Sequence, residues 1–142
     1  MKKARTIILI CIIAVAALSG GCSPAPDRVA SGGEQSIIAA VRDHAKHVQV
    51  QGEGTVIKLL PDDLEGERHQ RILLRLANGG TLLIAHNIDL AARVEGLREG
   101  DAIQFYGEFE WNDKGGVVHW THHDPQRRHP DGWIKFEGHT YQ

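Results

Sequence analysis

The chain has 142 residues, of which 42% are hydrophobic, and it holds 16 Lys and Arg against 18 Asp and Glu. This length accommodates one domain with a modest core and leaves little room for a second. The formal charge of −2 argues against general nucleic-acid binding, because that affinity comes mostly from cationic contacts to phosphate.

The first 21 residues differ in composition from the rest of the chain. Lys2, Lys3 and Arg5 precede an apolar run over residues 6–18, and small residues follow at 19–21. A positive start, an apolar run and a small-residue exit are typical of a secretory signal peptide. A membrane-spanning helix needs roughly 20 apolar residues, more than this run supplies. We therefore predict a signal peptide over residues 1–21, with a retained membrane anchor as the alternative.

Residues 18–22, Leu-Ser-Gly-Gly-Cys, resemble the bacterial lipobox, in which Cys22 would receive a lipid before cleavage. Ser19 departs from the motif, which usually has a large apolar residue at that position. We predict that Cys22 is lipidated and that residues 22–33 form a tether between the lipid and the domain. The protein would then be periplasmic and anchored to a bacterial membrane, with the outer membrane favoured. Cleavage without lipid, which would give a soluble periplasmic protein, is the alternative.

The chain that would remain after cleavage is acidic and lacks cross-links. Cys11 and Cys22 are the two cysteines, so residues 23–142 contain neither a disulfide nor a thiolate metal site. Residues 1–21 carry three of the basic residues and none of the acidic ones, so the remainder has a formal charge of −5 with His neutral. We predict one domain over residues 34–142.

The pattern of apolar residues divides this domain into elements. Apolar residues at helical spacing predict a helix over residues 35–47, which Gly52 and Gly54 would end. Asn78-Gly79-Gly80 and residues 112–116 tolerate positive φ, so each predicts a hairpin turn. A second, short helix or a helical turn is predicted over 88–97. Alternating apolar residues predict strands over 55–60, 69–77, 81–86, 101–111 and 117–123, with a short final strand at 133–136.

This order of elements predicts a mostly β fold. Three strands, a short helix and two more strands are the order of an OB-fold, a small five-stranded barrel. The N-terminal helix would cover one end of such a barrel. Another small barrel or a rolled sheet is the alternative arrangement.

Several long segments of the sequence have an unusual and distinctive composition. They lie at residues 60–63, 66–70, 85–89, 105–112 and 115–125, together with His129, residues 132–134 and residues 141–142. These segments resemble one bacterial family, known as domain of unknown function 3465. The resemblance covers nearly the whole chain after the tether. It implies a small exported protein and carries no established activity.

Histidines are the most distinctive candidates for chemistry, since the chain holds nine of them. The first hairpin would bring His69 near residues 86–89, and the second would place His119 opposite Glu108 or Phe109. Imidazole and carboxylate groups are ligands for zinc, copper, nickel and iron. We therefore predict a divalent transition-metal site, zinc for example, formed by His69, His86, His119 and His123.

The second hairpin would also place His123 opposite Gln104 or Phe105. Two further interpretations concern the same histidines. If a metal is bound, its water could be a hydrolytic nucleophile, with Asp89 or Glu108 as the catalytic base. Alternatively, the imidazoles hydrogen-bond to loops and pack against the three tryptophans, with no metal.

Three functions stay open at this point. The leading hypothesis is a periplasmic binding module for a small molecule or an envelope protein, with a His-rich metal site. The alternatives are a metal-dependent hydrolase and a structural partner in an envelope complex. The sequence shows no Gly-rich phosphate loop, nucleotide fingerprint or Ser-His-Asp order that would favour another class of enzyme.

Overall fold

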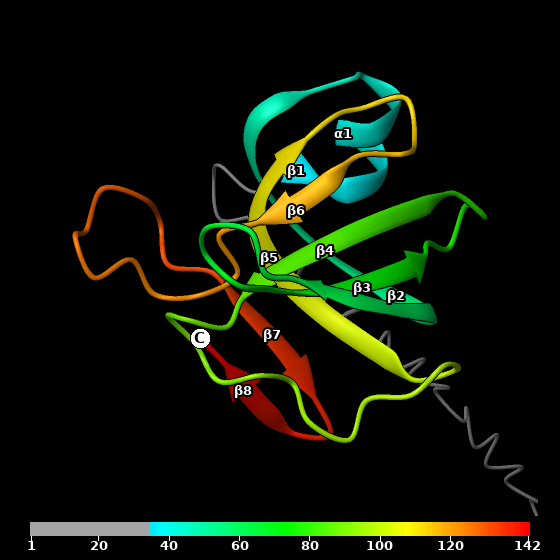
Figure 1. Ribbon diagram of the computed structural model, residues 1–142. Coiled ribbons are helices and arrows are strands. Elements are labelled where there is room, and N and C mark those ends of the chain that lie inside the picture. Colours follow the sequence, from blue (N-terminus) through cyan, green and yellow to red (C-terminus); the bar gives the residue numbers. More distant parts are fainter. Residues whose placement is uncertain (1–34) are drawn as a thin grey trace, which may run out of the picture.

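The computed structural model describes residues 35–142 (Figure 1). The predicted signal peptide, Cys22 and the tether fall outside the described residues. Within the described range, no helix is long and apolar enough to cross a membrane.

The described part of the chain is mostly β, as the sequence predicts. The first elements are β1 (Gln35–Ser36) and α1 (Ile37–Arg42). Seven strands follow, of which the first is by far the longest. They are β2 (Lys46–Asp63), β3 (His69–Arg75), β4 (Thr81–Asn87), β5 (Ala102–Glu110), β6 (Val117–His119), β7 (Trp133–Phe136) and β8 (His139–Tyr141).

Five of these strands form a closed ring of sheet. The neighbours run in the order β2, β3, β4, β6, β5, and β5 pairs again with β2. All of these pairs are antiparallel except β4–β6, which is parallel. The β7–β8 hairpin adds to β5 through Gln104–Tyr106. In Figure 1, α1 lies near one end of the ring and the β7–β8 hairpin near the other.

Alternation along the strands places the core inside the ring. In β3, β4 and β5, every second residue is buried, while the residues between them face outward. Apart from Gln70 at the start of β3 and His86 and Asn87 at the end of β4, the buried side chains of these strands are apolar, so closing the ring removes them from water. The largest fully buried apolar side chains are Phe105, Phe109, Ile72, Leu74, Leu82, Ile84, Ile103 and Ile134.

The N-terminal helix is shorter than predicted, because it ends at Arg42, the chain turns over residues 43–45, and β2 begins at Lys46. The helix covers Ile37–Arg42, with Ser36 accepting a hydrogen bond from the Ala39 N–H at 3.4 Å. Gly52 and Gly54 were expected to end the helix, but both lie within β2. A Cβ at Gly52 would lie 2.6 Å from Cγ2 of Ile37, so glycine lets α1 pack closely on the strand.

The segment over residues 88–97, predicted as a short helix or a helical turn, contains no helix: it consists of turns, a bend and irregular backbone. Two buried polar side chains bind its backbone. The Gln70 amide donates to the Val94 carbonyl at 3.1 Å and accepts from the Val94 N–H at 2.9 Å. The Nε2 atom of His86 lies 3.1 Å from the Ala92 carbonyl. The backbone groups of Ala92 and Val94 thus bond to side chains of β3 and β4 instead of to one another in a helix. The local apolar pattern does not predict such long-range hydrogen bonds.

Both predicted hairpins are confirmed. Gly79 has φ +82° between β3 and β4, and Gly115 and Gly116 have φ +106° and +95° between β5 and β6. The strand predicted over 117–123, however, ends at His119. The next residue, Trp120, has φ +55°, which takes the chain out of the sheet.

The close packing of α1 on β2 gives a stability test. We expect Gly52→Ala to lower the free energy of unfolding by about 1–3 kcal/mol, because the added methyl group overlaps Ile37. In the double variant with Ile37→Ala, the loss should be smaller than the sum of the two single losses. Urea denaturation followed by tryptophan fluorescence measures all four proteins. Strictly additive losses would show that this contact is not the reason for the glycine.

Candidate metal centre

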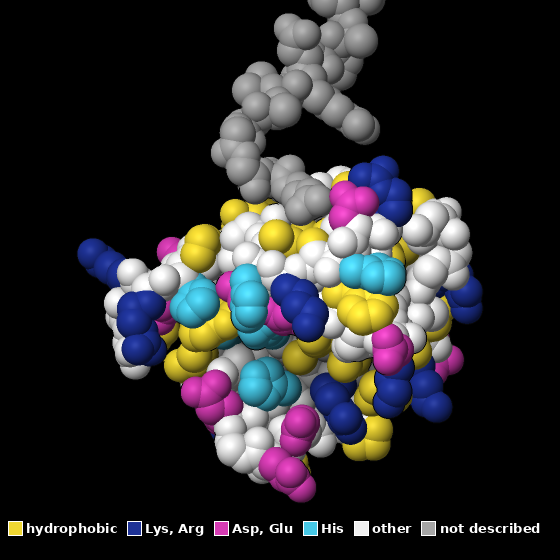
Figure 2. Space-filling model, turned by 90° about the horizontal axis from the view of Figure 1, so that it is seen from above, with side chains coloured by type: hydrophobic (Ala, Val, Ile, Leu, Met, Phe, Trp, Pro, Cys, Tyr) yellow, Lys and Arg dark blue, Asp and Glu magenta, His cyan; other side chains and the backbone are white. Residues whose placement is uncertain are grey.

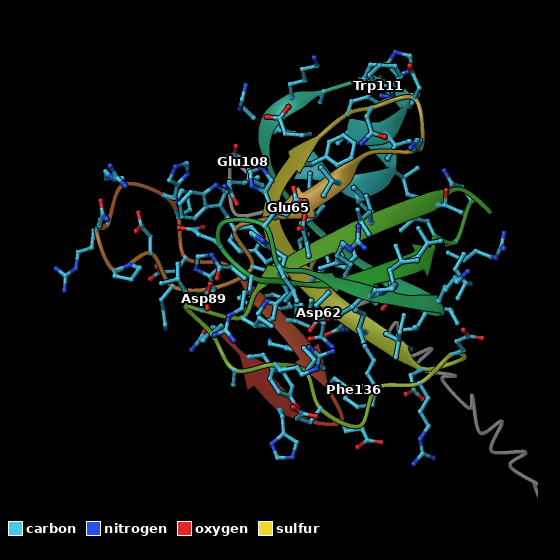
Figure 3. All side chains as sticks on the ribbon, viewed as in Figure 1. Asp62, Glu65, Asp89, Glu108, Trp111 and Phe136 are labelled. Atoms are coloured by element: carbon cyan, nitrogen blue, oxygen red, sulfur yellow. The ribbon has the colours of Figure 1, made fainter. Side chains whose placement is uncertain are left out.

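The outward face of β5 supplies two carboxylates to the site. Glu108 and Glu110 are two residues apart on the strand, so both point away from the core. On β6, His119 pairs directly with Glu108, as the sequence predicts. Figure 2 shows histidine and acidic side chains gathered on one face of the molecule, and Figure 3 labels Glu108.

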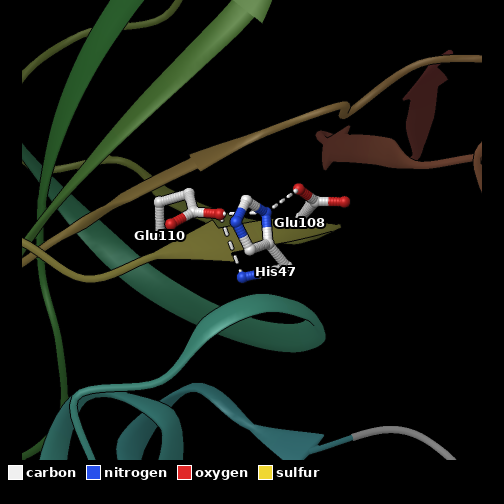
Figure 4. Close-up of side chains that lie close together, drawn as sticks. All are labelled: His47, Glu108 and Glu110. Carbon is white, nitrogen blue, oxygen red and sulfur yellow. Dashed lines mark hydrogen bonds and ion pairs between the residues drawn. The ribbon is translucent and has the colours of Figure 1, made fainter.

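A β-bulge at the start of β2 adds a histidine. The register of β2 against β5 shifts between Lys46 and Val48, and His47, the residue between them, has φ +54°. The His47 N–H donates to Oε1 of Glu110 at 3.0 Å instead of joining the ladder. Nδ1 of the same residue lies 2.5 Å from Oε1 of Glu110 and 3.4 Å from Oε1 of Glu108 (Figure 4).

A loop after β6 adds another histidine. Nδ1 of His129 lies 3.4 Å from Oε2 of Glu108. The His129 ring stacks on Trp120, with the centroids 3.9 Å apart and the planes 14° apart. The buried Asp124 carboxylate holds the loop, since it accepts the N–H groups of Gln126, Arg128 and His129 at 2.8, 2.6 and 2.9 Å. These bonds, that of Gln126 first, lower the pKa of Asp124.

Glu108 is the centre of the group. Its side chain is only 12% exposed, and three imidazoles surround it. The third of these, His119, has Nε2 3.8 Å from Oε1 of Glu108. Within residues 35–142 this Nε2 is buried and has no hydrogen-bond partner. Burial lowers the pKa of His119, which favours the neutral imidazole that a metal requires.

None of the other residues that the sequence proposed is paired with Glu108 in the described part of the chain, although His69 lines a cavity together with His119. His86 is fully buried inside the ring, and both of its nitrogens have partners: Oγ1 of Thr121 at 2.8 Å and the Ala92 carbonyl. His69 pairs with Asn87, as expected from the first hairpin, and its Nδ1 lies 2.8 Å from the Glu67 carbonyl.

The proposed base Asp89 is bound to Arg68 and lies apart from Glu108 (Figure 3). The Arg68 N–H and guanidinium both hydrogen-bond to the Asp89 carboxylate and lower its pKa. The expected pairing of His123 with Gln104 or Phe105 is wrong, because β7 occupies that edge of β5. The exposed His123 ring instead faces Asp131, with 3.0 Å between Nδ1 and Oδ2.

The structure thus assembles a different set from the predicted one. Glu108 and His119 were identified from the sequence, whereas His47, Glu110 and His129 were missed. Glu110 could have been found, because it shares the outward face with Glu108. His47 depends on a bulge and His129 on a folded loop, and neither leaves a periodic signal in the sequence.

A cavity adjoins the group. It has a volume of about 370 Å³, and His119 and Trp120 form part of its wall together with His69, His122 and Arg128. A small molecule could therefore reach His119 from this side.

The buried His86 predicts a pH dependence of stability. Burial lowers its pKa from 6.5 to about 4, so the unfolded chain binds more protons between these values. The free energy of unfolding should therefore fall as the pH drops from 6.5 to 4, by up to about 3 kcal/mol. Urea denaturation at several pH values measures this slope. His86→Gln should make the slope shallower, while the exposed His139→Gln control should not, and equal slopes in all three would refute this role.

Comparison with known proteins agrees with the resemblance seen in the sequence. No curated protein matches this chain. The family model described as "Protein of unknown function (DUF3465)" matches residues 24–142, which is most of the chain. The chain therefore belongs to the DUF3465 family.

Proposed function

We propose that this protein is an exported lipoprotein whose OB-like domain binds a divalent transition metal, such as zinc, at His47, Glu108 and Glu110. The proposal has three parts: the barrel, the metal site and the membrane anchor. Each part has its own support.

The strand order supports the OB-like part. In the ring, the first three strands are sequential neighbours, and the fifth strand lies between the third and the fourth. The parallel β4–β6 pair and the return of β5 to β2 close the ring. A five-stranded Greek-key barrel of this kind is a frequent scaffold for binding sites.

One observation carries the metal site. Donor atoms of His47, Glu108 and Glu110 all lie within 4.8 Å of one another. Two ligands of a tetrahedral ion, each bound at about 2.1 Å, lie ~3.4 Å apart. The distance from Nδ1 of His47 to Oε1 of Glu108 is 3.4 Å, which matches this spacing. Oε1 of Glu110 lies only 2.5 Å from the same Nδ1, so the Glu110 carboxylate would have to move outward when an ion binds. The remaining coordination position would be open to water or to a ligand.

The arrangement favours binding over hydrolysis. Asp89, proposed as a base, is occupied by Arg68, and Glu108 would itself be a ligand. Of the four histidines first proposed as ligands, His119 alone contacts Glu108. It is not part of the group of three ligands, so we propose that it lies next to the ion without binding it.

The anchor rests on the N-terminal sequence. The charged start, the apolar run and the small residues before Cys22 support export and lipid attachment. The lipid would tether the domain to the periplasmic side of a bacterial membrane, the outer membrane being favoured. The partners would then be that membrane and a metal ion, with an unknown small molecule or envelope protein at the open position.

We expect the metal site to depend on Glu108. Zinc titration by calorimetry, on protein purified without a metal-affinity tag, should show binding that Glu108→Gln weakens at least about 100-fold. This estimate follows because even the loss of an outer partner costs 10–100-fold. The matched control His139→Ala, on the β7–β8 hairpin, should bind like the parent protein. Absence of binding by zinc, copper, nickel and cobalt in the parent protein would refute the site.

We expect the membrane anchor to depend on Cys22. When cells are fractionated, Cys22→Ser should move the protein from the membrane to the soluble periplasmic fraction, because the acyl chains supply the membrane affinity. Cys11→Ser is a matched control, since Cys11 lies within the predicted signal peptide, and it should leave the protein in the membrane fraction. A parent protein that fractionates as soluble would refute lipidation.

A further inference from the structure

The cavity beside His119 is lined mostly by polar side chains that come from separate parts of the chain. His69 lies at the start of β3 and His119 at the end of β6, while His122 and Arg128 belong to the loop after β6. The cavity has a volume of about 370 Å³. Small-molecule sites span roughly 300–1,000 Å³, so this one would hold a small ligand.

Two of these imidazoles have a fixed tautomer when they are neutral. Nδ1 of His69 donates to the Glu67 carbonyl at 2.8 Å. Nδ1 of His122 donates to the His123 carbonyl at 2.7 Å. Because a carbonyl only accepts, Nδ1 carries the proton in each neutral ring and Nε2 keeps its lone pair. The His122 side chain is only 2% exposed, yet it lines the cavity. Each ring therefore brings one hydrogen-bond acceptor to the cavity wall.

The charged groups of the wall are of both signs. The Arg128 guanidinium donates hydrogen bonds, and the Glu67 carboxylate accepts them. One Glu67 oxygen already accepts from the Asn87 amide at 2.9 Å. Asp124 also lines the cavity, but its carboxylate accepts three backbone N–H groups of its own loop. The wall therefore offers acceptors and a strong donor side by side.

This mixture of donors and acceptors disfavours a ligand of one charge. The oxygens of an anion only accept, so an anion would face the lone pairs of His69 and His122. An ammonium group only donates, so it would face the Arg128 guanidinium. A hydroxyl group both donates and accepts, and it can bond to either kind of group. The wall therefore favours a neutral ligand with several hydroxyl groups.

Part of the same wall is apolar. Leu90, Trp120 and Pro125 line the cavity together with the polar side chains. The Trp120 ring is held by stacking on His129, with the centroids 3.9 Å apart. A sugar ring has hydroxyl groups at its rim and C–H groups on its faces, and the C–H groups pack on apolar and aromatic side chains. A wall fixed before binding also loses less entropy when the ligand arrives.

We propose that this cavity binds a small neutral saccharide. Hydroxyl groups of the sugar donate to Nε2 of His69 and of His122, and another accepts from the Arg128 guanidinium. One face of the ring lies against the apolar part of the wall. None of the three proposed metal ligands lines this cavity, so sugar binding does not depend on the metal ion and goes beyond the proposed function.

Sugar binding in the presence of a chelator tests this proposal. The full chain, in a detergent without a sugar head group, is mixed with EDTA at about pH 8, where free imidazole is neutral. Saturation-transfer NMR then measures its affinity for N-acetylglucosamine, glucose and galactose. We expect at least one of these sugars to bind. Arg128→Ala should weaken that binding at least about 10-fold, and His69→Ala about 3–10-fold, because the first loses a charged hydrogen bond and the second a neutral one.

Two matched variants control for nonspecific effects. Neither Arg127 nor His139 lines the cavity, so Arg127→Ala and His139→Ala should bind the sugar like the parent protein. His69→Gln should keep most of the affinity, because its amide oxygen can accept in place of Nε2. Circular dichroism shows that each variant is folded.

Three results would overturn the saccharide site. The first is that none of the three sugars binds. The second is equal affinity in the parent protein, Arg128→Ala and His69→Ala, since the sugar would then bind elsewhere. The third is binding of succinate or putrescine, the anionic and cationic probes, in place of the sugars. None of these results affects the proposed metal site, because zinc binding is measured without a sugar.

Discussion

The pairing of β2 with β5 is the constraint on which the rest of the structure depends. It runs from Lys46 opposite Glu110 to Thr55 opposite Ala102, and it closes the ring. A closed ring has no free edge between its five strands, so the outward faces of β5, β6 and the start of β2 are fixed against one another. The two carboxylates and two of the imidazoles of the candidate metal centre lie on these faces. Glu108, Glu110 and His119 are therefore positioned by ladder hydrogen bonds, while His47 lies in a bulge of β2 and His129 in the loop after β6.

Buried polar groups connect the inside of the ring to this site. His86 ties the irregular segment at Ala92 to Thr121, which follows the strained residue Trp120. On β5, Gly107 lets the backbone of His119 approach closely, because a Cβ at Gly107 would lie 2.4 Å from the His119 carbonyl oxygen. The β2–β5 ladder is regular at Gly107, so this close approach occurs without a bulge. The position of the loop that carries His129 thus depends on contacts made on both sides of the sheet.

The candidate centre is held together by contacts between imidazoles and carboxylates. His47 and Glu110 are 2.5 Å apart, whereas Nε2 of His119 has no hydrogen-bond partner within residues 35–142. The metal ion of the proposed function would separate these pairs and bind the imidazole and the carboxylates itself. The low exposure of Glu108 strengthens either kind of contact by limiting screening from water.

Local patterns in the sequence were sufficient for much of this protein. Period-two alternation and glycine turns determined β3, β4, β5 and both hairpins, and the hairpin register brought His119 opposite Glu108. Tertiary structure alone decided the length of β2, the absence of a helix at 88–97 and the bulge that turns His47 toward Glu110. The physical reason is that periodicity records which face of a segment is apolar. It does not record which distant strand supplies the hydrogen bonds that bend a segment out of its local preference.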